Sequence, residues 1–255
     1  MKKSSCVRAN LTFSIEKNSG TRCNTNTGGT NVTIVQLGSM IRGVNLKRLL
    51  AIASFYLINF GLWELLKGYI GPEWDSFLVY VILFPLIIAI FGKEIRSEWK
   101  EFSSILKTKS FYVKLLIWLI LDLLLTGLLL WGISYFGWDI LPQNNDSVKE
   151  QMTVVPTYLT VIQGCIFAPV IEELVFRYAI IGKPKNAVAQ VLLFLVSVVM
   201  FDCIHIVRPL EFFYYLIPAL FLTSFYMTKK NPFISMSLHS VINIVGYISL
   251  IVGVL

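Results

Sequence analysis

Apolar residues in this chain gather in long, nearly uninterrupted runs. An apolar run of roughly 17 to 25 residues is long enough to cross the hydrocarbon core of a bilayer as an α-helix. About seven runs of this kind occur, over residues 49–66, 74–92, 115–136, 153–181, 187–207, 212–228 and 233–255. The pattern predicts an all-α integral membrane protein with about seven transmembrane helices.

The composition agrees with this interpretation. The chain has 255 residues, of which 56% are hydrophobic and 15% are charged, whereas soluble proteins carry about 25% charged residues. Tryptophan prefers the interface between lipid and water, and four tryptophans fall at or near the ends of the runs: Trp63, Trp74, Trp131 and Trp138. The lipid bilayer is therefore the predicted environment.

Basic residues alternate between dense and sparse connections. They collect before the first run and in the connections after the second, fourth and sixth: Arg42, Lys47, Arg48, Lys93, Arg96, Lys100, Lys107, Lys109, Lys114, Lys183, Lys185, Lys229 and Lys230. The other connections offer Lys67, Lys149 and Arg208. Since cytoplasmic loops carry the excess of Lys and Arg, we expect a multi-pass protein of the cell membrane with a cytoplasmic N-terminus. Topology and anionic lipid explain the net charge of +7, so no nucleic-acid partner is expected.

The chain divides into three parts by composition. Residues 1–39 are polar, rich in Gly, Ser, Thr and Asn, and predict a disordered N-terminal tail. Residues 40–150 contain three transmembrane runs, and residues 151–255 contain four runs together with most of the intramembrane polar residues. The four cysteines form no C-x-x-C pair, so neither a disulfide nor a metal role is expected for Cys6, Cys23, Cys165 and Cys203.

Two adjacent carboxylates and an arginine interrupt the fourth run, in "EELVFR" at residues 172–177. Positions four apart share a helix face, so Glu173 and Arg177 are predicted to form an ion pair while Glu172 points elsewhere. A desolvated carboxylate without a local cation suits a general base. The alternative is that all three residues only pair with other helices. A further acid, Asp122 in the third run, is expected to snorkel or pair near the cytoplasmic side, with participation in a site as the alternative.

The only two histidines of the chain lie in or at the ends of predicted spans. His205 follows Phe201 by one turn and Asp202 by three residues, so Asp202 is expected to accept from the imidazole ring or to pair with Arg208. His239 precedes Asn243 by one turn, and a histidine beside an asparagine makes a two-donor cradle suited to an oxyanion.

Three short motifs together resemble a known family. "EELVFR", "FDCIH" and "HSVIN" match E-E-x-x-x-R, F-x-x-x-H and H-x-x-x-N, the motifs of the CAAX protease and bacteriocin-processing (CPBP or Abi) family of intramembrane endopeptidases. Each motif alone is weakly specific, but the three occur in order on successive membrane segments. The resemblance covers about residues 150–250, which places the predicted active site among helices four, five and seven.

The resemblance implies roles for the motif residues. Glu172 and His205 would activate a water molecule, and His239 and Asn243 would hold the developing oxyanion. The supporting positions would be Glu173, Arg177, Phe201 and Asp202.

The metal requirement stays open at this point. Glu172, His205 and His239 would also make a His₂Glu zinc set with an open position for water. They lack the compact H-E-x-x-H spacing, so we expect no obligatory cofactor and keep zinc as the alternative.

The expected activity is hydrolysis of a peptide bond in a membrane-embedded or lipid-modified peptide or protein substrate. In the family this activity serves bacteriocin or peptide processing, self-immunity or CAAX-type trimming. Two other classes remain open: a non-catalytic immunity or regulatory membrane partner that keeps the fold, and a small transporter with a charged pathway.

One feature of the topology is difficult to reconcile with a shared site. At about 1.5 Å per residue, Glu172 and His239 lie roughly 10 to 15 Å from the cytoplasmic ends of their spans, whereas His205 lies nearly at the far side. If these residues act together, the helix over 187–207 must be tilted or begin late, and the corner "RPLE" after it must dip into the membrane.

Overall fold

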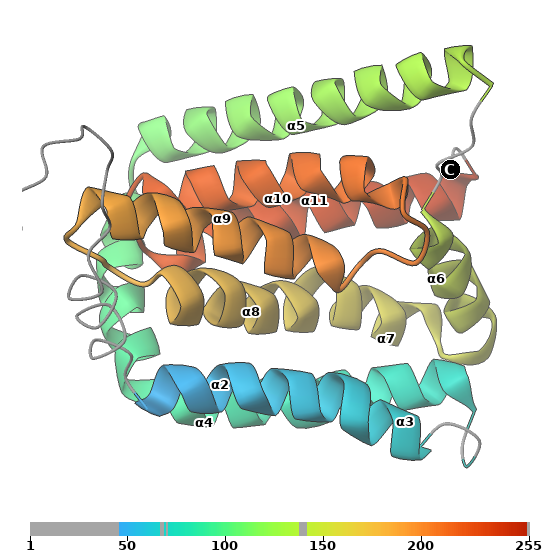
Figure 1. Cartoon of the computed structure of the whole chain (residues 1–255), viewed down its shortest axis with the longest axis horizontal. Coiled ribbons are helices and arrows are strands. Elements are labelled where there is room, and N and C mark those ends of the chain that lie inside the picture. Colours follow the sequence, from blue (N-terminus) through green and yellow to red (C-terminus); the bar gives the residue numbers. More distant parts are fainter. Residues whose placement is uncertain (1–45, 67–68, 70, 138–141, 254–255) are drawn as a thin grey trace, which may run out of the picture. The chain divides into compact units, whose positions relative to one another are not determined.

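The computed structural model describes residues 46–66, 69, 71–137 and 142–253. All of them belong to the compact unit Met40–Leu255, and each regular element in these ranges is helical (Figure 1). The predicted tail over residues 1–39 and the predicted interfacial Trp138 lie outside the described residues.

Helices follow the predicted runs in order. In chain order, with η for π-helical segments, they are α2 (Leu46–Tyr56), η1 (Leu57–Leu62), α3 (Trp63–Leu66), α4 (Pro72–Ile105), α5 (Lys109–Tyr135), α6 (Gln143–Val154), α7 (Thr157–Ile162), η2 (Gln163–Phe167), α8 (Ala168–Glu172), η3 (Glu173–Ile181), α9 (Ala187–Cys203), α10 (Glu211–Met227) and α11 (Pro232–Val252).

The predicted fold class is confirmed. Within the described ranges, five helical stretches are long and apolar enough to cross a membrane: Leu46–Leu66, Glu73–Ile105, Lys109–Tyr135, Thr157–Ile181 and Pro232–Val252. The remaining two predicted spans correspond to α9 and α10, which have 17 residues each. All seven predicted runs therefore form helices.

Two elements differ from the predicted boundaries. α4 does not end near residue 92 but continues to Ile105, where Glu94 pairs with Lys47 and Glu98 pairs with Lys183, each at 2.7 Å. These ion pairs join the polar end of α4 to neighbouring segments. α6 was not predicted, because its sequence "QNNDSVKEQMTV" has no apolar run.

The segment from α7 to η3 forms the centre of this unit. Its helices pack against α2, α4, α9 and α11. Of the residues in its most apolar 18-residue stretch, 61% are buried, against 6% for the corresponding stretch of α5. The segment ends where Gly182, at a φ of 60°, donates its N–H to the carbonyl of Arg177 at 3.0 Å. This i→i+5 bond is the π-helical pattern, which is frequent at functional sites.

α9 resolves the depth mismatch of His205. Residues 182–186 run outward past the end of η3, so that α9 begins farther out than η3 ends and then slants across α8 (Figure 1). Its C-terminal end brings His205 to the level of Glu172, with the two side chains 3.9 Å apart. Of the two predicted alternatives, the slant of α9 agrees with a tilt, whereas the helix does not begin late, because its first residue is Ala187 as in the predicted run.

Candidate active site

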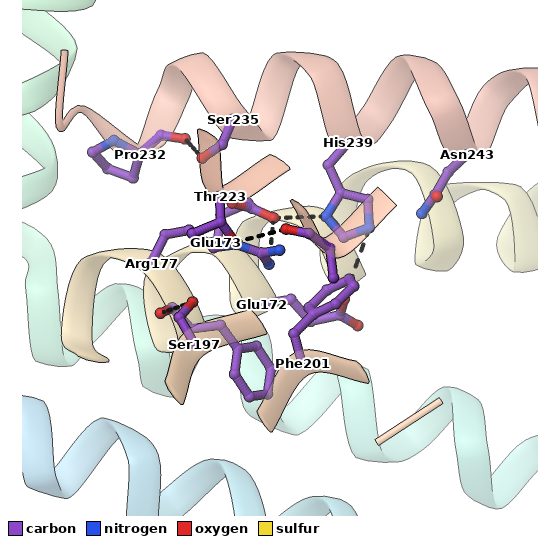
Figure 2. A network of polar contacts seen from close by, with 12 residues as sticks. Glu172, Glu173, Arg177, Ser197, Phe201, Thr223, Pro232, Ser235, His239 and Asn243 are labelled. Atoms are coloured by element: carbon purple, nitrogen blue, oxygen red, sulfur yellow. Dashed lines mark hydrogen bonds and ion pairs between the residues drawn. The ribbon is translucent and has the colours of Figure 1, made fainter. Parts of the chain in front are cut away.

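The motif residues converge from three membrane segments. Glu172 ends α8, Glu173 and Arg177 lie on η3, His205 follows α9, and His239 lies on α11. Figure 2 shows the side chains of Glu172, Glu173 and His239 directed toward one another, with Phe201 beside them. The predicted grouping of helices four, five and seven around one site is present.

The predicted ion pair of Glu173 and Arg177 is confirmed. Arg177 Nη1 lies 2.9 Å from Glu173 Oε1, and both side chains are fully buried. The same Glu173 oxygen is 2.9 Å from Nδ1 of His239 (Figure 2). The arginine is also stacked 4.1 Å above the ring of Phe201, an attractive cation–π arrangement. Glu173 therefore joins the arginine to a histidine of the neighbouring helix.

Glu172 occupies the position between the two imidazoles. Its carboxylate Oε2 lies 3.9 Å from His205 Nε2 and 3.8 Å from His239 Nε2. Its other oxygen accepts a hydrogen bond of 3.2 Å from the hydroxyl of Tyr80 on α4. Tyr80 is a site residue that sequence reasoning missed, because a single tyrosine in an apolar run belongs to no recognisable motif.

The hydrogen-bond partners fix the tautomers of both histidines. Nδ1 of His205 lies 2.8 Å from the carbonyl oxygen of Phe201, and a carbonyl only accepts, so Nδ1 carries the hydrogen. Nδ1 of His239 likewise donates to the carboxylate of Glu173. In their neutral forms both rings therefore direct the unprotonated Nε2 toward Glu172.

The structure contradicts the two predicted roles of Asp202. The Nδ1 of His205 is bonded to the Phe201 carbonyl, and the Arg208 Nε lies 3.0 Å from Glu211. Within the described part of the chain, neither carboxylate oxygen of the fully buried Asp202 has a hydrogen-bond partner. The helix ends at Cys203, and the imidazole turns back to the carbonyl four residues earlier.

Phe201, predicted as a supporting residue, lies in contact with both histidines. Its ring centroid lies 4.7 Å from that of His205 and 5.7 Å from that of His239. The ring of Phe201 thus packs against both imidazoles, and the guanidinium of Arg177 also lies over this ring. An aromatic side chain at this position keeps the three polar groups at fixed separations.

Asn243 reaches the site from α11. Its Nδ2 donates to the carbonyl of Gly164 on η2 at 2.7 Å, so one of its two amide hydrogens is engaged. A Cβ at Gly164 would collide with the ring of Tyr247. The close contact between η2 and α11 therefore requires glycine, and it positions Asn243 at the wall of the cavity.

A cavity of about 670 Å³ opens beside these groups. Glu172, His205, His239 and Asn243 line it, together with residues of α4, α5, α6 and α10. α6 is fixed to the rest of the unit by Gln151, whose Nε2 donates to the carbonyl of Glu73 at 3.1 Å and to the Gln163 side chain at 2.9 Å. The cavity is large enough for a peptide segment of a few residues.

Asp122 differs from its main predicted role. It neither snorkels nor pairs near a membrane surface but lines this cavity from α5. Its side chain is 2% exposed, although the residues on either side of it are exposed apolar side chains. α5 is rotated so that its one mid-helix carboxylate faces inward, where it avoids the cost of contact with lipid.

A bound zinc ion requires a particular spacing of its donor atoms. One carboxylate and two unprotonated imidazole nitrogens are donors that suit zinc, but ligand bonds of 2.0–2.1 Å in a tetrahedron would place them about 3.3 Å apart. The separations are 3.8 and 3.9 Å, and no group of three donors in the described ranges has the spacing of a metal site. Cys165 and Cys203 are free thiols. As arranged, these residues do not fit a bound zinc ion.

Residues 154–245 match a family model described as type II CAAX prenyl endopeptidase Rce1-like. Over these residues, the match agrees with the predicted resemblance to the CAAX protease family. The Rce1-like segment contains all the motif residues from Glu172 to Asn243, whereas Tyr80 and Asp122 lie before it. No curated protein and no solved structure matches the chain. At the level of the family, the comparison supports a CAAX-type membrane endopeptidase.

Proposed function

We propose that the protein is an intramembrane endopeptidase that hydrolyses a peptide bond of a membrane-embedded or lipid-modified substrate. The observation that carries this proposal is the buried carboxylate of Glu172, which faces the Nε2 atoms of His205 and His239 at 3.9 and 3.8 Å. The match of this segment to an endopeptidase family supports the same reaction class.

The separations suit one water molecule between the groups. Distances of 3.8 and 3.9 Å are too long for a direct hydrogen bond, but a water about 2.8 Å from each group bonds to both. Glu172 and the lone pair of His205 then orient this water and accept its proton as its oxygen attacks the peptide carbonyl. No step requires a metal ion.

His239 and Asn243 suit stabilisation of the oxyanion that develops on the peptide carbonyl. His239 acts in this step in its doubly protonated form, with a proton taken up at Nε2 from bulk water before the reaction and retained through it. The Glu173 carboxylate 2.9 Å from Nδ1 stabilises that cation, and the Nε2–H donates to the oxyanion. The second amide hydrogen of Asn243 is free of the bond to Gly164. Collapse of the tetrahedral intermediate breaks the C–N bond, and the proton held by Glu172 passes to the leaving amine.

The substrate reaches the site from within the bilayer in this scheme. Glu172, His239 and Asn243 lie in helical stretches that are apolar and long enough to cross a membrane, and the matched family model is described as a CAAX prenyl endopeptidase. Processing of a bacteriocin or another peptide, self-immunity and CAAX-type trimming all use this chemistry.

Two other classes predict different behaviour. A non-catalytic immunity or regulatory partner has no need for a carboxylate held between two oriented imidazoles, and its function would survive Glu172→Gln. A small transporter would lose flux across liposomes in that variant without cutting any peptide. Both are less well supported by the hydrogen-bonding pattern around Glu172.

The direct test uses the purified full chain in lipid nanodiscs with a farnesylated peptide that ends in a CAAX sequence and with a set of acylated transmembrane peptides. We expect cleavage by the wild type and by Glu101→Gln, which removes an exposed acid of α4, but none by Glu172→Gln. Cleavage should persist in 1,10-phenanthroline. Equal cleavage by Glu172→Gln would contradict the assigned base, and loss in the chelator with recovery on added zinc would contradict the metal-free scheme.

A further inference from the structure

α5 carries a single charge in the middle of the membrane. Asp122 is the only charged residue between Leu115 and Tyr135. Its neighbours Leu121 and Leu123 are 45% and 39% exposed, whereas Asp122 is 2% exposed. A buried intramembrane acid is costly, so its inward position requires an interaction that offsets the cost.

In the described ranges the chain supplies Asp122 with an electrostatic attraction to His239 but with no hydrogen bond to its buried Oδ1. Oδ1 of Asp122 has no hydrogen-bond partner there, and neither has the hydroxyl of Thr126, one helical turn later. Both residues line the active-site cavity. Two unpartnered oxygens on one face of α5 thus point into the space that the substrate would occupy.

The permanently charged side chains around the cavity have one sign, and the groups in its described lining that can become cationic are the imidazoles of His205 and His239. The lining includes Glu73, Asp122, Glu150 and Glu172, and no lysine or arginine is among the described residues that line the cavity. Arg177, the buried cation nearest in sequence to Glu172, is paired with Glu173 outside this lining. A carboxylate shielded from water is best satisfied by a cation that also donates hydrogen bonds.

We propose that Asp122 is a specificity-determining residue that binds a lysine or arginine side chain of the peptide substrate inside the active-site cavity. This inference rests on the proposed endopeptidase function and names a substrate class for it, a peptide with a basic residue in the segment that enters the membrane cavity. Thr126 accepts a second hydrogen bond from the same cation. Acidic side chains are disfavoured throughout the cavity by the like charges that line it.

The test uses palmitoylated hexapeptides of neutral residues in which one lysine is moved through each position. Each peptide has a twin with norleucine, which keeps most of the alkyl chain of lysine without the ammonium group. For wild type in nanodiscs we expect at least one position at which kcat/KM for the lysine peptide exceeds that of its twin by roughly 10- to 100-fold, the range for a hydrogen bond to a charged group. Asp122→Asn should remove this preference by lowering kcat/KM for the lysine peptide alone.

A matched control is available on α9. Asp202 is also a fully buried acid whose carboxylate oxygens have no hydrogen-bond partner in the described ranges, but it does not line the cavity. Asp202→Asn should leave the ratio between the lysine and norleucine peptides as in wild type, and Asp122→Glu should restore part of it. An unchanged ratio in Asp122→Asn, or no lysine preference at any position, would overturn the inference.

A binding measurement separates this inference from the proposed function. Glu172→Gln should bind the preferred fluorescent lysine peptide more tightly than its norleucine twin, and Asp122→Asn in that background should equalise the two dissociation constants. If the difference in binding is found but wild type cuts no peptide, the recognition site stands and the endopeptidase fails. If wild type cuts both twins equally and Glu172→Gln binds them equally, the endopeptidase stands and the role of Asp122 fails.

Discussion

The position of the hydrogen on each imidazole ring decides whether Glu172 faces a hydrogen-bond donor or an acceptor. The carbonyl of Phe201 and the carboxylate of Glu173 take the Nδ1 hydrogens of His205 and His239. When both rings are neutral, their Nε2 atoms are acceptors that lie 3.9 and 3.8 Å from Oε2 of Glu172, itself an acceptor. Such an arrangement favours a bound proton donor between them, which in the proposed reaction is the attacking water.

Tyr80→Phe tests the support of the base. The change removes the hydroxyl that donates to Oε1 of Glu172 at 3.2 Å and leaves the ring in place. A hydrogen bond of this length contributes on the order of 1 kcal/mol, so we expect kcat/KM to fall roughly fivefold with unchanged thermal stability in detergent.

The matched control for this variant is Tyr158→Phe, which removes a hydroxyl from an exposed side chain on α7. Steady-state kinetics on one peptide substrate provide the comparison. Wild-type kcat/KM in Tyr80→Phe would show that the phenol does not act on Glu172 during the reaction.

Arg177→Met tests the buried ion pair. The variant leaves Glu173 charged and fully buried without its cation, a change that typically destabilises by about 3 to 5 kcal/mol. We expect a large fall in melting temperature in detergent, partly recovered by adding Glu173→Gln, which removes the uncompensated charge.

Lys183→Met is the comparison for that experiment. Lys183 is 47% exposed in its pair with Glu98, and an exposed pair contributes about 1 kcal/mol or less. Its melting temperature should stay near that of wild type. Equal melting temperatures for Arg177→Met and Lys183→Met would mean that the buried pair does not hold η3 in place.

At the residue scale, the spacing of residues along the chain predicted one contact of the site and missed others. The four-residue separation of Glu173 and Arg177 was enough to predict their pair, since such positions share a face in an α-turn and remain close in a π-turn. The same reasoning failed for Asp202, because His205 lies beyond the end of α9 and its ring follows the turn rather than the helix. Tyr80 could not be predicted at all, because its contact with Glu172 joins residues 92 apart in sequence.

At the scale of elements, the turn after α9 and the start of α6 share one anchor. The carboxylate of Glu211 accepts hydrogen bonds from the backbone N–H groups of Gln143, Val207 and Arg208 at 3.0, 2.8 and 3.2 Å. The side chain of Arg208 adds a fourth contact at 3.0 Å. Glu211 thereby joins the polar helix beside the cavity to the segment that carries His205.

Glu211→Gln should loosen both segments. The amide keeps the size of the side chain but replaces one acceptor oxygen with a donor, so the N–H groups of Gln143 and Val207 can no longer both be satisfied. We expect faster proteolysis at α6 and a fall in kcat that exceeds the change in KM, because His205 loses its fixed position.

Asp146→Asn provides the control for this experiment, since it removes an exposed acid from α6 itself. It should be cut by protease at the wild-type rate. If Glu211→Gln also matches wild type in proteolysis and in kcat, the anchor has no role in positioning the histidine.

The π-helical segments were beyond sequence reasoning for a physical reason. η2 and η3 flank α8 and are set by packing of the buried segment against α11 and α9, not by local propensity. Gly164 is the clearest case: its lack of a Cβ matters only because Tyr247 lies against it. The apolar runs, by contrast, gave the number and order of the helices, since the hydrophobic length needed to cross a bilayer is a local property.

At the scale of the whole described unit, the basic residues gather at one side. The start of α2, the junction of α4 with α5, the start of α9 and the junction of α10 with α11 lie at one end of the helices, and α6 lies at the other (Figure 1). The excess of lysine and arginine in the first group predicts that this end is cytoplasmic.

Single-cysteine labelling tests this topology. In a background with the four native cysteines changed to serine, Lys185→Cys should react with a membrane-impermeant maleimide only after the cells are opened, whereas Lys149→Cys should react in intact cells. Both side chains are exposed. Labelling of Lys185→Cys in intact cells would reverse the predicted orientation.

The most direct test of the central claim compares protein and peptide termini in cells that express wild type or Glu172→Gln at equal levels. If the protein is an endopeptidase with Glu172 as its base, new N- or C-termini of membrane or secreted peptides appear only with wild type, and they identify the substrate. If the two sets of termini coincide while deletion of the gene still has a phenotype, the motif residues serve structure or binding, and the catalytic role of Glu172 is contradicted.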